Sequence, residues 1–223
     1  MSAEHRTNGG VARGLSGFDK FIVNVDQALR TLVPGATTAE RPNPGASVGA
    51  SPMAAEAQRH TAGLMRINHT GEICAQALYQ GQALTAQLPE VRDSMEQAAR
   101  EESDHLAWCE SRLNELGSRP SVLNPLWYGM SFGLGAVAGL AGDRWSLGFV
   151  AETENQVCKH LQEHLAQLPA DDQRSKAILE QMLIDEGAHE THARAAGGAE
   201  LPAPVKGVMA AMARVMKTAV YKV

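Results

Sequence analysis

Aromatic residues, which are favoured in β-strands, are scarce in this sequence, with three Trp, three Tyr and four Phe among 223 residues. Alternating runs of Val, Ile and Thr are almost absent from Met53 onward, where Ala, Leu, Glu and Gln dominate. The sequence therefore lacks the usual strand signals, and it predicts an all-α protein.

Basic residues and cysteines are also few. The chain has 20 basic and 25 acidic residues, and this net charge of -5 disfavours a general nucleic-acid binder. Its three cysteines are odd in number and far apart, which favours buried thiols in a reducing compartment over a disulfide. The N-terminal segment lacks both the apolar core of a secretory signal and the Arg-rich run of a transit peptide. We therefore expect a cytoplasmic protein of bacterial type.

Helical periodicity is what the sequence has in abundance. It predicts helices at about 18–33, 53–86, 89–116, 143–168, 172–195 and 204–221. Pro89 and Pro169 lie near helix starts, and Gly117 and Gly197 lie near helix ends, as expected for these residues. A segment rich in Pro and Gly follows the first helix, so we divide the chain into an N-terminal arm (1–52) and a helical domain (53–223).

Two Glu-x-x-His pairs occur in the helical domain, at Glu102 with His105 and at Glu186 with His189. Residues three apart share one face of a helix, so each pair points in one direction. Two such pairs alone prove little, because they could lie on solvated helix faces. Their surroundings decide the interpretation.

Each pair is preceded by another glutamate at the distance of one helical hairpin. The separation from Glu72 to Glu102 is nearly the same as that from Glu154 to Glu186. Apolar residues flank Glu154 and Glu186 at helical spacing, so these carboxylates lie on faces that should be buried. The sequence thus presents the pattern Glu…Glu-x-x-His twice.

Four carboxylates on apolar faces are costly to bury unless cations compensate them. Two divalent ions would balance four Glu, and two neutral imidazoles would complete the ligand set of a di-metal four-helix bundle. Carboxylate and imidazole ligands favour iron or manganese over structural zinc. We predict a ferritin-like four-helix bundle whose metal ligands are Glu72, Glu102, His105, Glu154, Glu186 and His189.

Three segments resemble the demethoxyubiquinone hydroxylases of ubiquinone biosynthesis: RINHTGEICAQALYQGQ, EESDHLAWCESRLNELG and VAETENQVCKHL. The resemblance extends from about residue 55 to the C-terminus, and NHTGE is its most specific part. It implies a membrane-associated di-iron monooxygenase that hydroxylates the ring of a polyprenylated demethoxy-benzoquinol with O2. The family's iron ligands fall on the same six residues, and the analogy with ferritin-like sites makes Glu102 and Glu186 the bridging carboxylates.

The resemblance also suggests roles outside the ligand set. His160 matches a family histidine that serves substrate or proton transfer, although a surface histidine is an equally good interpretation. Asp185 and Glu101, each next to a ligand Glu, are candidate acceptors for the N–H groups of the ligand histidines. The reductant would be NADH or an electron-transfer partner. The sequence GLGAVAG has neither the spacing nor the preceding strand of a dinucleotide-binding motif.

Residues 120–142 include a long uncharged segment with two Gly-x-x-x-Gly pairs, at 129/133 and 135/139, that would allow close helix packing. About 17 apolar residues are marginal for spanning a bilayer, which takes about 20. We therefore favour, over a transmembrane span, a helix that lies in the membrane surface or lines a channel for the prenyl tail.

The C-terminal segment from Leu201 to Val223 is basic and amphipathic, with Lys206, Arg214, Lys217 and Lys222 and no acid. Such a helix either rests on anionic lipid or packs on the core. With the uncharged segment, it predicts peripheral association with the cytoplasmic face of the bacterial inner membrane. A homo-oligomer or a ubiquinone-biosynthesis complex is a further expectation.

Other proteins share parts of this pattern. An iron-storage ferritin, a di-manganese catalase and a di-iron tRNA hydroxylase have similar ligands, and a helical adaptor without metal is a fourth alternative. The tRNA enzyme would need a basic groove, which this acidic chain does not indicate. A hydroxylase needs room for an aromatic ring beside the metals, and the small residues that could leave this room are Gly71, Ala75, Ala98, Ala99 and Ala151.

Overall fold

The computed structural model describes residues 17–223, and in this range the chain is all-helical, without strands. The helices of the described range are α1 (Gly17–Leu32), the 3-10 helix η1 (Pro44–Ser47), α2 (Ala55–Thr85), α3 (Pro89–Glu115), α4 (Asn124–Leu140), α5 (Asp143–Gln167), α6 (Gln173–Ala195) and α7 (Ala203–Val220). The predicted fold class is confirmed. All six expected helices are present, and their ends lie close to the predicted ones.

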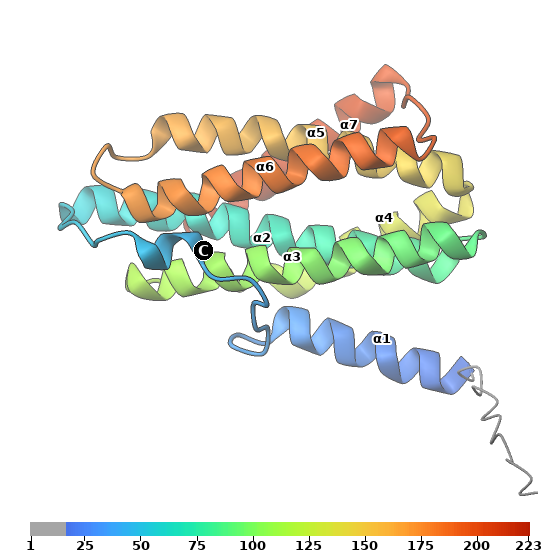
Figure 1. Cartoon of the computed structure of the whole chain (residues 1–223), viewed down its shortest axis with the longest axis horizontal. Coiled ribbons are helices and arrows are strands. Elements are labelled where there is room, and N and C mark those ends of the chain that lie inside the picture. The colour runs from blue at the N-terminus through green and yellow to red at the C-terminus, as the bar shows by residue number, and fades with distance from the viewer. Residues whose placement is uncertain (1–16) are drawn as a thin grey trace, which may run out of the picture.

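Two helical hairpins form the bundle, as Figure 1 shows: α2 pairs with α3, and α5 pairs with α6. The hairpins pack face to face, with α3 against α6 and α2 against α5. Met65, Trp108, Leu161 and Leu179 fill one end of the interior and are almost fully buried. Each large apolar side chain buried in this way contributes about 1.5–3 kcal/mol.

Local sequence signals explain where these helices begin and end. Gly117 and Gly197 follow α3 and α6 with φ of 66° and 97°, a left-handed conformation that glycine adopts without steric cost. Asp172 caps α6, because its side chain accepts a hydrogen bond from the Ser175 backbone N–H at 3.1 Å. These signals fix the length of each hairpin, and therefore the level at which its Glu and His residues meet.

The uncharged segment forms α4, which packs along α2 with its backbone in direct contact. A side chain at Gly135 would collide with the Leu78 carbonyl, and one at Gly139 would collide with Thr85. Added side chains at Gly129 and Gly133 would meet open space instead. The second Gly-x-x-x-Gly pair, at 135/139, therefore allows α4 to pack closely on α2, whereas the first pair, at 129/133, does not contribute to this packing. No helix within residues 17–223 is long and apolar enough to cross a bilayer.

The described part of the N-terminal arm is packed on the bundle. Helix α1 lies against α2 and α4, on the side facing away from α5 and α6 (Figure 1). The 3-10 helix contacts α6 and α3. The prediction that the chain begins without a targeting signal concerns mainly residues 1–16, which lie outside the described range.

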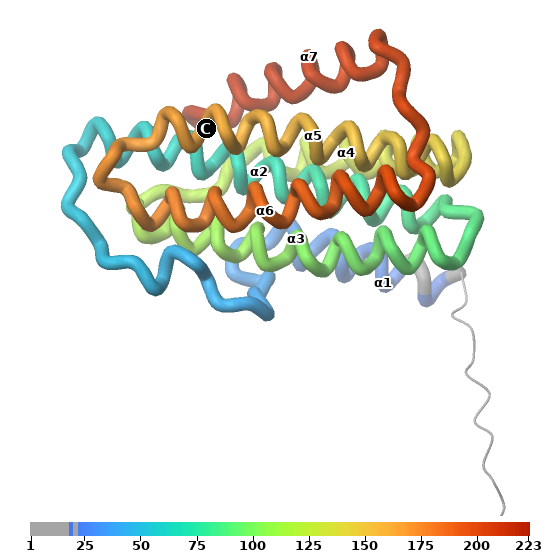
Figure 2. Tube along the Cα trace, turned by 45° about the horizontal axis from the view of Figure 1, so that its top comes forward, coloured from blue at the N-terminus to red at the C-terminus, as the bar shows by residue number. Residues whose placement is uncertain are grey.

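Helix α7 lies along the outer side of α5 and α2, at the top of Figure 2. Its own residues Met216 and Val220 are buried, packed with Ile67 of α2 and Trp127 of α4. Lys206 pairs with Glu152 of α5 at 3.3 Å, and Lys217 pairs with Glu163 of α5 at 3.4 Å. Two of the four basic residues expected to face lipid therefore hold α7 to the bundle. The other two, Arg214 and Lys222, are exposed.

Candidate metal centre

All six predicted ligands point into the bundle. They come from four different helices: Glu72 from α2, Glu102 and His105 from α3, Glu154 from α5, and Glu186 and His189 from α6. The four glutamates and His105 are at most 3 % exposed. The His189 side chain is 14 % exposed and marks the more open end of the cluster.

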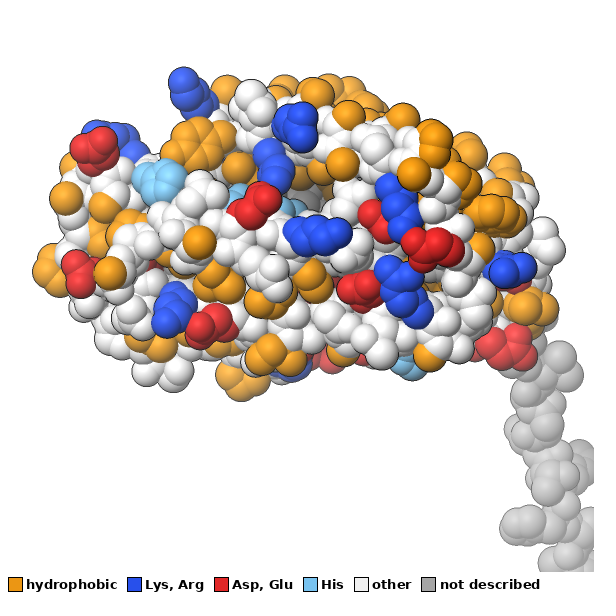
Figure 3. Space-filling model, turned by 90° about the horizontal axis from the view of Figure 1, so that it is seen from above, with side chains coloured by type: hydrophobic (Ala, Val, Ile, Leu, Met, Phe, Trp, Pro, Cys, Tyr) orange, Lys and Arg blue, Asp and Glu red, His pale blue; other side chains and the backbone are white. Residues whose placement is uncertain are grey.

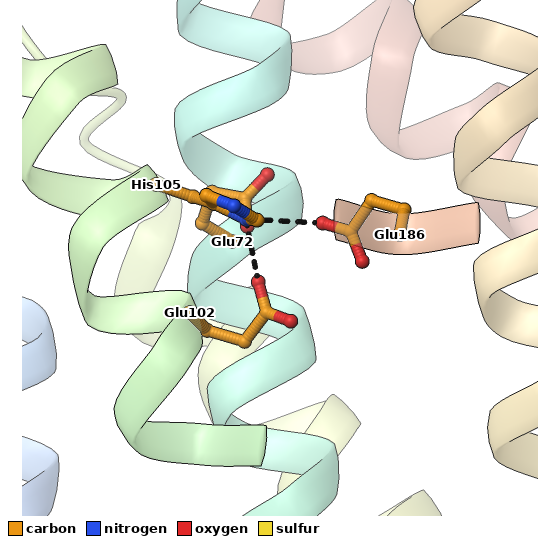
Figure 4. A group of neighbouring side chains, drawn as sticks. All are labelled: Glu72, Glu102, His105 and Glu186. Atoms are coloured by element: carbon orange, nitrogen blue, oxygen red, sulfur yellow. Dashed lines mark hydrogen bonds and ion pairs between the residues drawn. The ribbon is translucent and has the colours of Figure 1, made fainter. Parts of the chain in front are cut away.

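Four of these residues form one compact group. Glu72, Glu102, His105 and Glu186 each offer a ligand atom, and these atoms lie within 4.8 Å of one another. Figure 4 shows the three carboxylates around the imidazole of His105. The group joins both hairpins, because Glu186 comes from α6 and the others come from α2 and α3.

Glu102 and Glu186 each face both histidines. The Glu102 oxygens lie 3.1 Å from Nδ1 of His105 and 3.2 Å from Nδ1 of His189. The Glu186 oxygens lie 3.1 Å and 3.2 Å from the same two nitrogens. Each carboxylate thus has one oxygen near His105 and the other near His189, as a carboxylate that bridges two metal ions would.

The remaining two glutamates take outer positions. An oxygen of Glu72 lies 3.6 Å from Nδ1 of His105. Glu154 lies outside the compact group, and its charge interacts with those of Glu186, Glu102 and His189. Tyr79 of α2 donates a hydrogen bond to Oε1 of Glu154, while Oε2 has no hydrogen-bond partner among the described residues.

The far nitrogens of the two histidines are also bonded. Nε2 of His105 lies 2.9 Å from Oδ2 of Asp185, and Nε2 of His189 lies 2.7 Å from Oε2 of Glu101. Both expected partners of the histidines therefore have the required contact. Each acid belongs to the helix opposite its histidine. Because Nε2 donates to a carboxylate in each of these bonds, Nδ1 is the nitrogen that can bind a metal once it has lost its own proton.

The electrostatics of the cluster call for positive charge. Burial raises the pKa of Glu72 and of Glu154 well above the usual range. Burial alone would lower the pKa of His189, but hydrogen bonds to Glu102 and Glu186 raise it to about 12. Protons bound to these side chains thus compensate the negative charge that a bound cation would otherwise compensate. With four carboxylates, two imidazoles and an unpartnered carboxylate oxygen on Glu154, the donor set fits divalent metal ions.

A groove of about 630 Å³ lies between α2, α4, α5 and α7. Gly71 and Ala75 line it on either side of Glu72 along α2, and Leu134 lines it from α4. His160 lies in its α5 wall, where burial lowers the imidazole pKa to about 3. Figure 3 views the molecule from this side: Lys and Arg side chains surround a hollow, with hydrophobic side chains along the upper edge.

The small residues expected beside the ring space have different positions in the structure. Gly71 and Ala75 line the groove, whereas Ala99 lines a second cavity, of about 710 Å³, between α1, α2 and α3. Ala98 and Ala151 belong to a core cluster around Tyr79 and line neither cavity. Ala151 is buried in this cluster, with 2% exposed.

Sequence reasoning missed two residues near the cluster. Tyr79 lies two helical turns after Glu72, which places it on the same helix face, so its spacing could have identified it. Arg41 of the arm forms an ion pair with Asp185 at 2.9 Å. No periodicity or motif marks that arginine, because it lies in an irregular segment.

The fold and the cluster together define the class of protein. It is an all-α helical bundle with a buried group of carboxylates and histidines that can hold metal ions. A model of the family described as ubiquinone biosynthesis protein COQ7 matches residues 59–220. The chain belongs to this family.

Curated relatives from several bacteria are named 3-demethoxyubiquinol 3-hydroxylase. The relative from Pseudomonas aeruginosa (strain UCBPP-PA14) is 61% identical over 211 residues, which cover 95% of this chain and 98% of the relative. The relative from Azotobacter vinelandii is 60% identical over 211 residues, with the same coverage of both chains. The relative from Acinetobacter baumannii is 61% identical over 210 residues, covering 94% of this chain and 99% of the relative. The similarity therefore includes most of the N-terminal arm.

Proposed function

We propose that this chain uses O2 to hydroxylate the ring of a polyprenylated demethoxy-benzoquinol in ubiquinone biosynthesis. The observation that carries the proposal is the position of Glu102 and Glu186 between the two histidines, in a chain 60% to 61% identical to 3-demethoxyubiquinol 3-hydroxylases. The proposed oxygen chemistry would use two metal ions, and both ions would share this pair of carboxylates.

Two iron ions would be held by six side chains of this protein. Glu72 and His105 would bind one ion, Glu154 and His189 would bind the other, and Glu102 and Glu186 would bridge them. When bound, the irons supply the activation of O2 and the transfer of one oxygen atom to the ring. The reducing equivalents would come from NADH or from an electron-transfer partner.

The residues around the ligands fix their orientation. Asp185 and Glu101 hold the Nε2 protons of the two histidines, which selects the tautomer that binds metal through Nδ1. Tyr79 fixes one oxygen of Glu154. Trp108 and Met182 are almost fully buried in the adjoining core and keep bulk water away from one end of the site.

The groove suits a quinol with a long apolar tail. Its volume of about 630 Å³ lies within the range of about 300–1,000 Å³ typical of small-molecule sites. Gly71 and Ala75 leave room next to Glu72, and the wall farther out includes Leu78, Leu134 and Met212. The ring would enter beside Glu72, with the prenyl tail between α4 and α7.

The outer face of α4 would contact the membrane, on the cytoplasmic side of the inner membrane. It exposes a row of apolar side chains without a charge: Leu126, Met130, Leu134, Val137 and Leu140. Contiguous apolar surface of this kind is typical of membrane or protein interfaces. Met130 and Leu134 also line the groove, so a quinol in the bilayer would meet the groove at the same surface.

The quinone profile of a deletion strain tests the function. The strain should accumulate the demethoxy precursor, and the plasmid-borne wild-type chain should restore ubiquinone. A plasmid carrying Glu186→Ala should not restore it. Normal ubiquinone in the deletion strain would refute the proposed function.

A further inference from the structure

The two halves of the candidate metal centre have unlike surroundings. On one side, His105 is bonded to Asp185, which in turn forms an ion pair with Arg41 of the N-terminal arm. On the other side, His189 is bonded to Glu101, whose further hydrogen bond comes from the neutral amide of Gln97. Among the described residues, no Lys or Arg forms an ion pair with Glu101.

Arg41 is held in place from several directions. Its Nη1 lies 2.9 Å from Oδ2 of Asp185, and its Nε lies 2.5 Å from Oδ2 of Asp104. Its guanidinium carbon lies over the Trp108 ring, 4.9 Å from the centroid. The backbone N–H groups of Glu40 and Arg41 donate to Oδ1 of Asp104. A guanidinium fixed in this way can orient a neighbouring carboxylate, because its planar N–H groups have fixed directions.

The oxygen of Asp185 that accepts from Arg41 is the same one that faces the histidine. Oδ2 lies 2.9 Å from Arg41 Nη1 and 2.9 Å from His105 Nε2. Oδ1 accepts from Gln181 at 2.9 Å, so both carboxylate oxygens are occupied. The Asp185 side chain is 16% exposed, whereas that of Glu101 is 43% exposed and more open to water. The carboxylate bonded to His105 is therefore better shielded from water than the one bonded to His189.

We infer that Arg41 is a positioning residue that makes the two metal-binding halves unequal. It compensates the charge of Asp185 and holds this carboxylate against His105, so the ion bound by His105 and Glu72 is held more tightly than the ion bound by His189 and Glu154. The inference rests on the proposed function, because it assumes two bound ions. It gives the arm a role at the centre in addition to its packing on the bundle.

Anaerobic titration of the purified full-length chain with Fe(II), together with Mössbauer spectra of the ⁵⁷Fe(II)-loaded protein, tests the inference. The variants are Arg41→Gln, Arg41→Lys and, as a matched control, Arg30→Gln. Arg30 is also an arginine of the arm, but it is exposed and pairs with Asp26 of its own helix. Circular dichroism of each variant checks that helix content is retained.

The wild type should bind two ions with separate affinities and give two distinct quadrupole doublets. In Arg41→Gln the tighter ion should be bound about 10–100-fold more weakly, the usual effect of losing a residue that orients a ligand. The weaker ion and its doublet should not change. Arg41→Lys should recover part of the loss, because an ammonium keeps the charge but cannot span both carboxylates. Arg30→Gln should match the wild type.

Unchanged affinities in Arg41→Gln would overturn the inference. Equal weakening of both ions would also overturn it, because Arg41 would then serve to dock the arm and not to position Asp185. A wild-type chain that binds no iron at all would instead refute the metal centre of the proposed function, and the inference with it. The titration of the wild type thus separates the two failures.

Discussion

The hydroxyl of Tyr79 on α2 donates a hydrogen bond to Glu154 on α5, across the interior of the bundle. Both side chains are buried, with 2 % and 1 % exposed. Helix α2 also carries Glu72. This one helix therefore supplies a carboxylate to one half of the candidate centre and orients the carboxylate of the other half.

Tyr79→Phe should weaken iron binding in the Glu154 half by about tenfold, because Glu154 would lose the donor that orients it. Helix content should not change, since the phenyl ring retains its packing. Fe(II) titration measures the effect. Tyr128→Phe is the matched control: Tyr128 is also buried, but it donates to Gln80 at 2.5 Å. Equal iron binding by the two variants would show that the Tyr79 hydroxyl has no role at the centre.

Glu102→Ala and Glu186→Ala should each abolish product formation, because each removes a carboxylate that both ions would share. Iron per chain should fall from about two in the wild type, the number that the six-ligand bundle site implies. Glu110→Ala is the control, since Glu110 lies on α3 and accepts from the Gly35 backbone instead. Stoichiometric zinc in place of iron, in protein made with ample iron, would contradict the assignment.

Gly71→Phe should block the ring from the groove while leaving iron in place. A Cβ at Gly71 would meet no atom within 4 Å, so the new ring can extend into the groove. The variant should still consume O2 after reduction, with little hydroxylated quinol formed. Gly187→Phe is the matched control, because Gly187 also has open space around it and adjoins a ligand, Glu186, but does not line the groove. Full turnover by Gly71→Phe would place the substrate elsewhere.

Val137→Asp and Leu140→Asp should move the protein from the membrane to the soluble fraction in flotation assays. These side chains are 64 % and 70 % exposed on α4 and, unlike Leu134, they do not line the groove. Ile184→Asp is the control: Ile184 is 66 % exposed, but on α6. If the α4 variants float with liposomes as the wild type does, this face is an interface between protein chains.

Charge reversal at Arg214 or Lys222 should weaken binding to anionic vesicles by about 1 kcal/mol each, or roughly fivefold. Both residues are exposed. Reversal at Lys206 or Lys217 should instead lower the melting temperature, because these residues pair with α5. The two pairs of variants can be compared by flotation and by thermal unfolding. If all four reversals weaken flotation and none lowers the melting temperature, the ion pairs of Lys206 and Lys217 with α5 do not form.

His164→Gln should reduce the pH dependence of stability between pH 4 and 6.5. Burial, with the positive charges of Lys217 and His60, lowers the pKa of His164 to about 4. The unfolded chain therefore binds more protons at this residue below pH 6.5, and the stability that His164 contributes is lost as the pH falls. The substitution should lower the slope by up to about 1.4 kcal/mol per pH unit. Urea unfolding at several pH values measures it, and parallel curves for wild type and variant would contradict the prediction.

Much of the fold could be predicted from the sequence because its signals are local. Apolar periodicity together with Pro89, Gly117 and Gly197 set the helix limits, and the nearly equal spacing within the two hairpins aligned the Glu-x-x-His pairs. The docking of the arm could not be predicted. It depends on single contacts such as that between Arg41 and Asp185, which lie far apart in the chain, and no local pattern encodes a contact of this kind.

The α2–α3 and α5–α6 hairpins each bring two carboxylates and one imidazole to the surface where they meet. Closing the bundle thus brings like charges together, and a bound cation strengthens the closed form by mass action. With iron as that cation, the chain in an iron-poor cell would open between its hairpins more often and expose its interior to proteases. Iron supply would then control the lifetime of the protein as well as its activity.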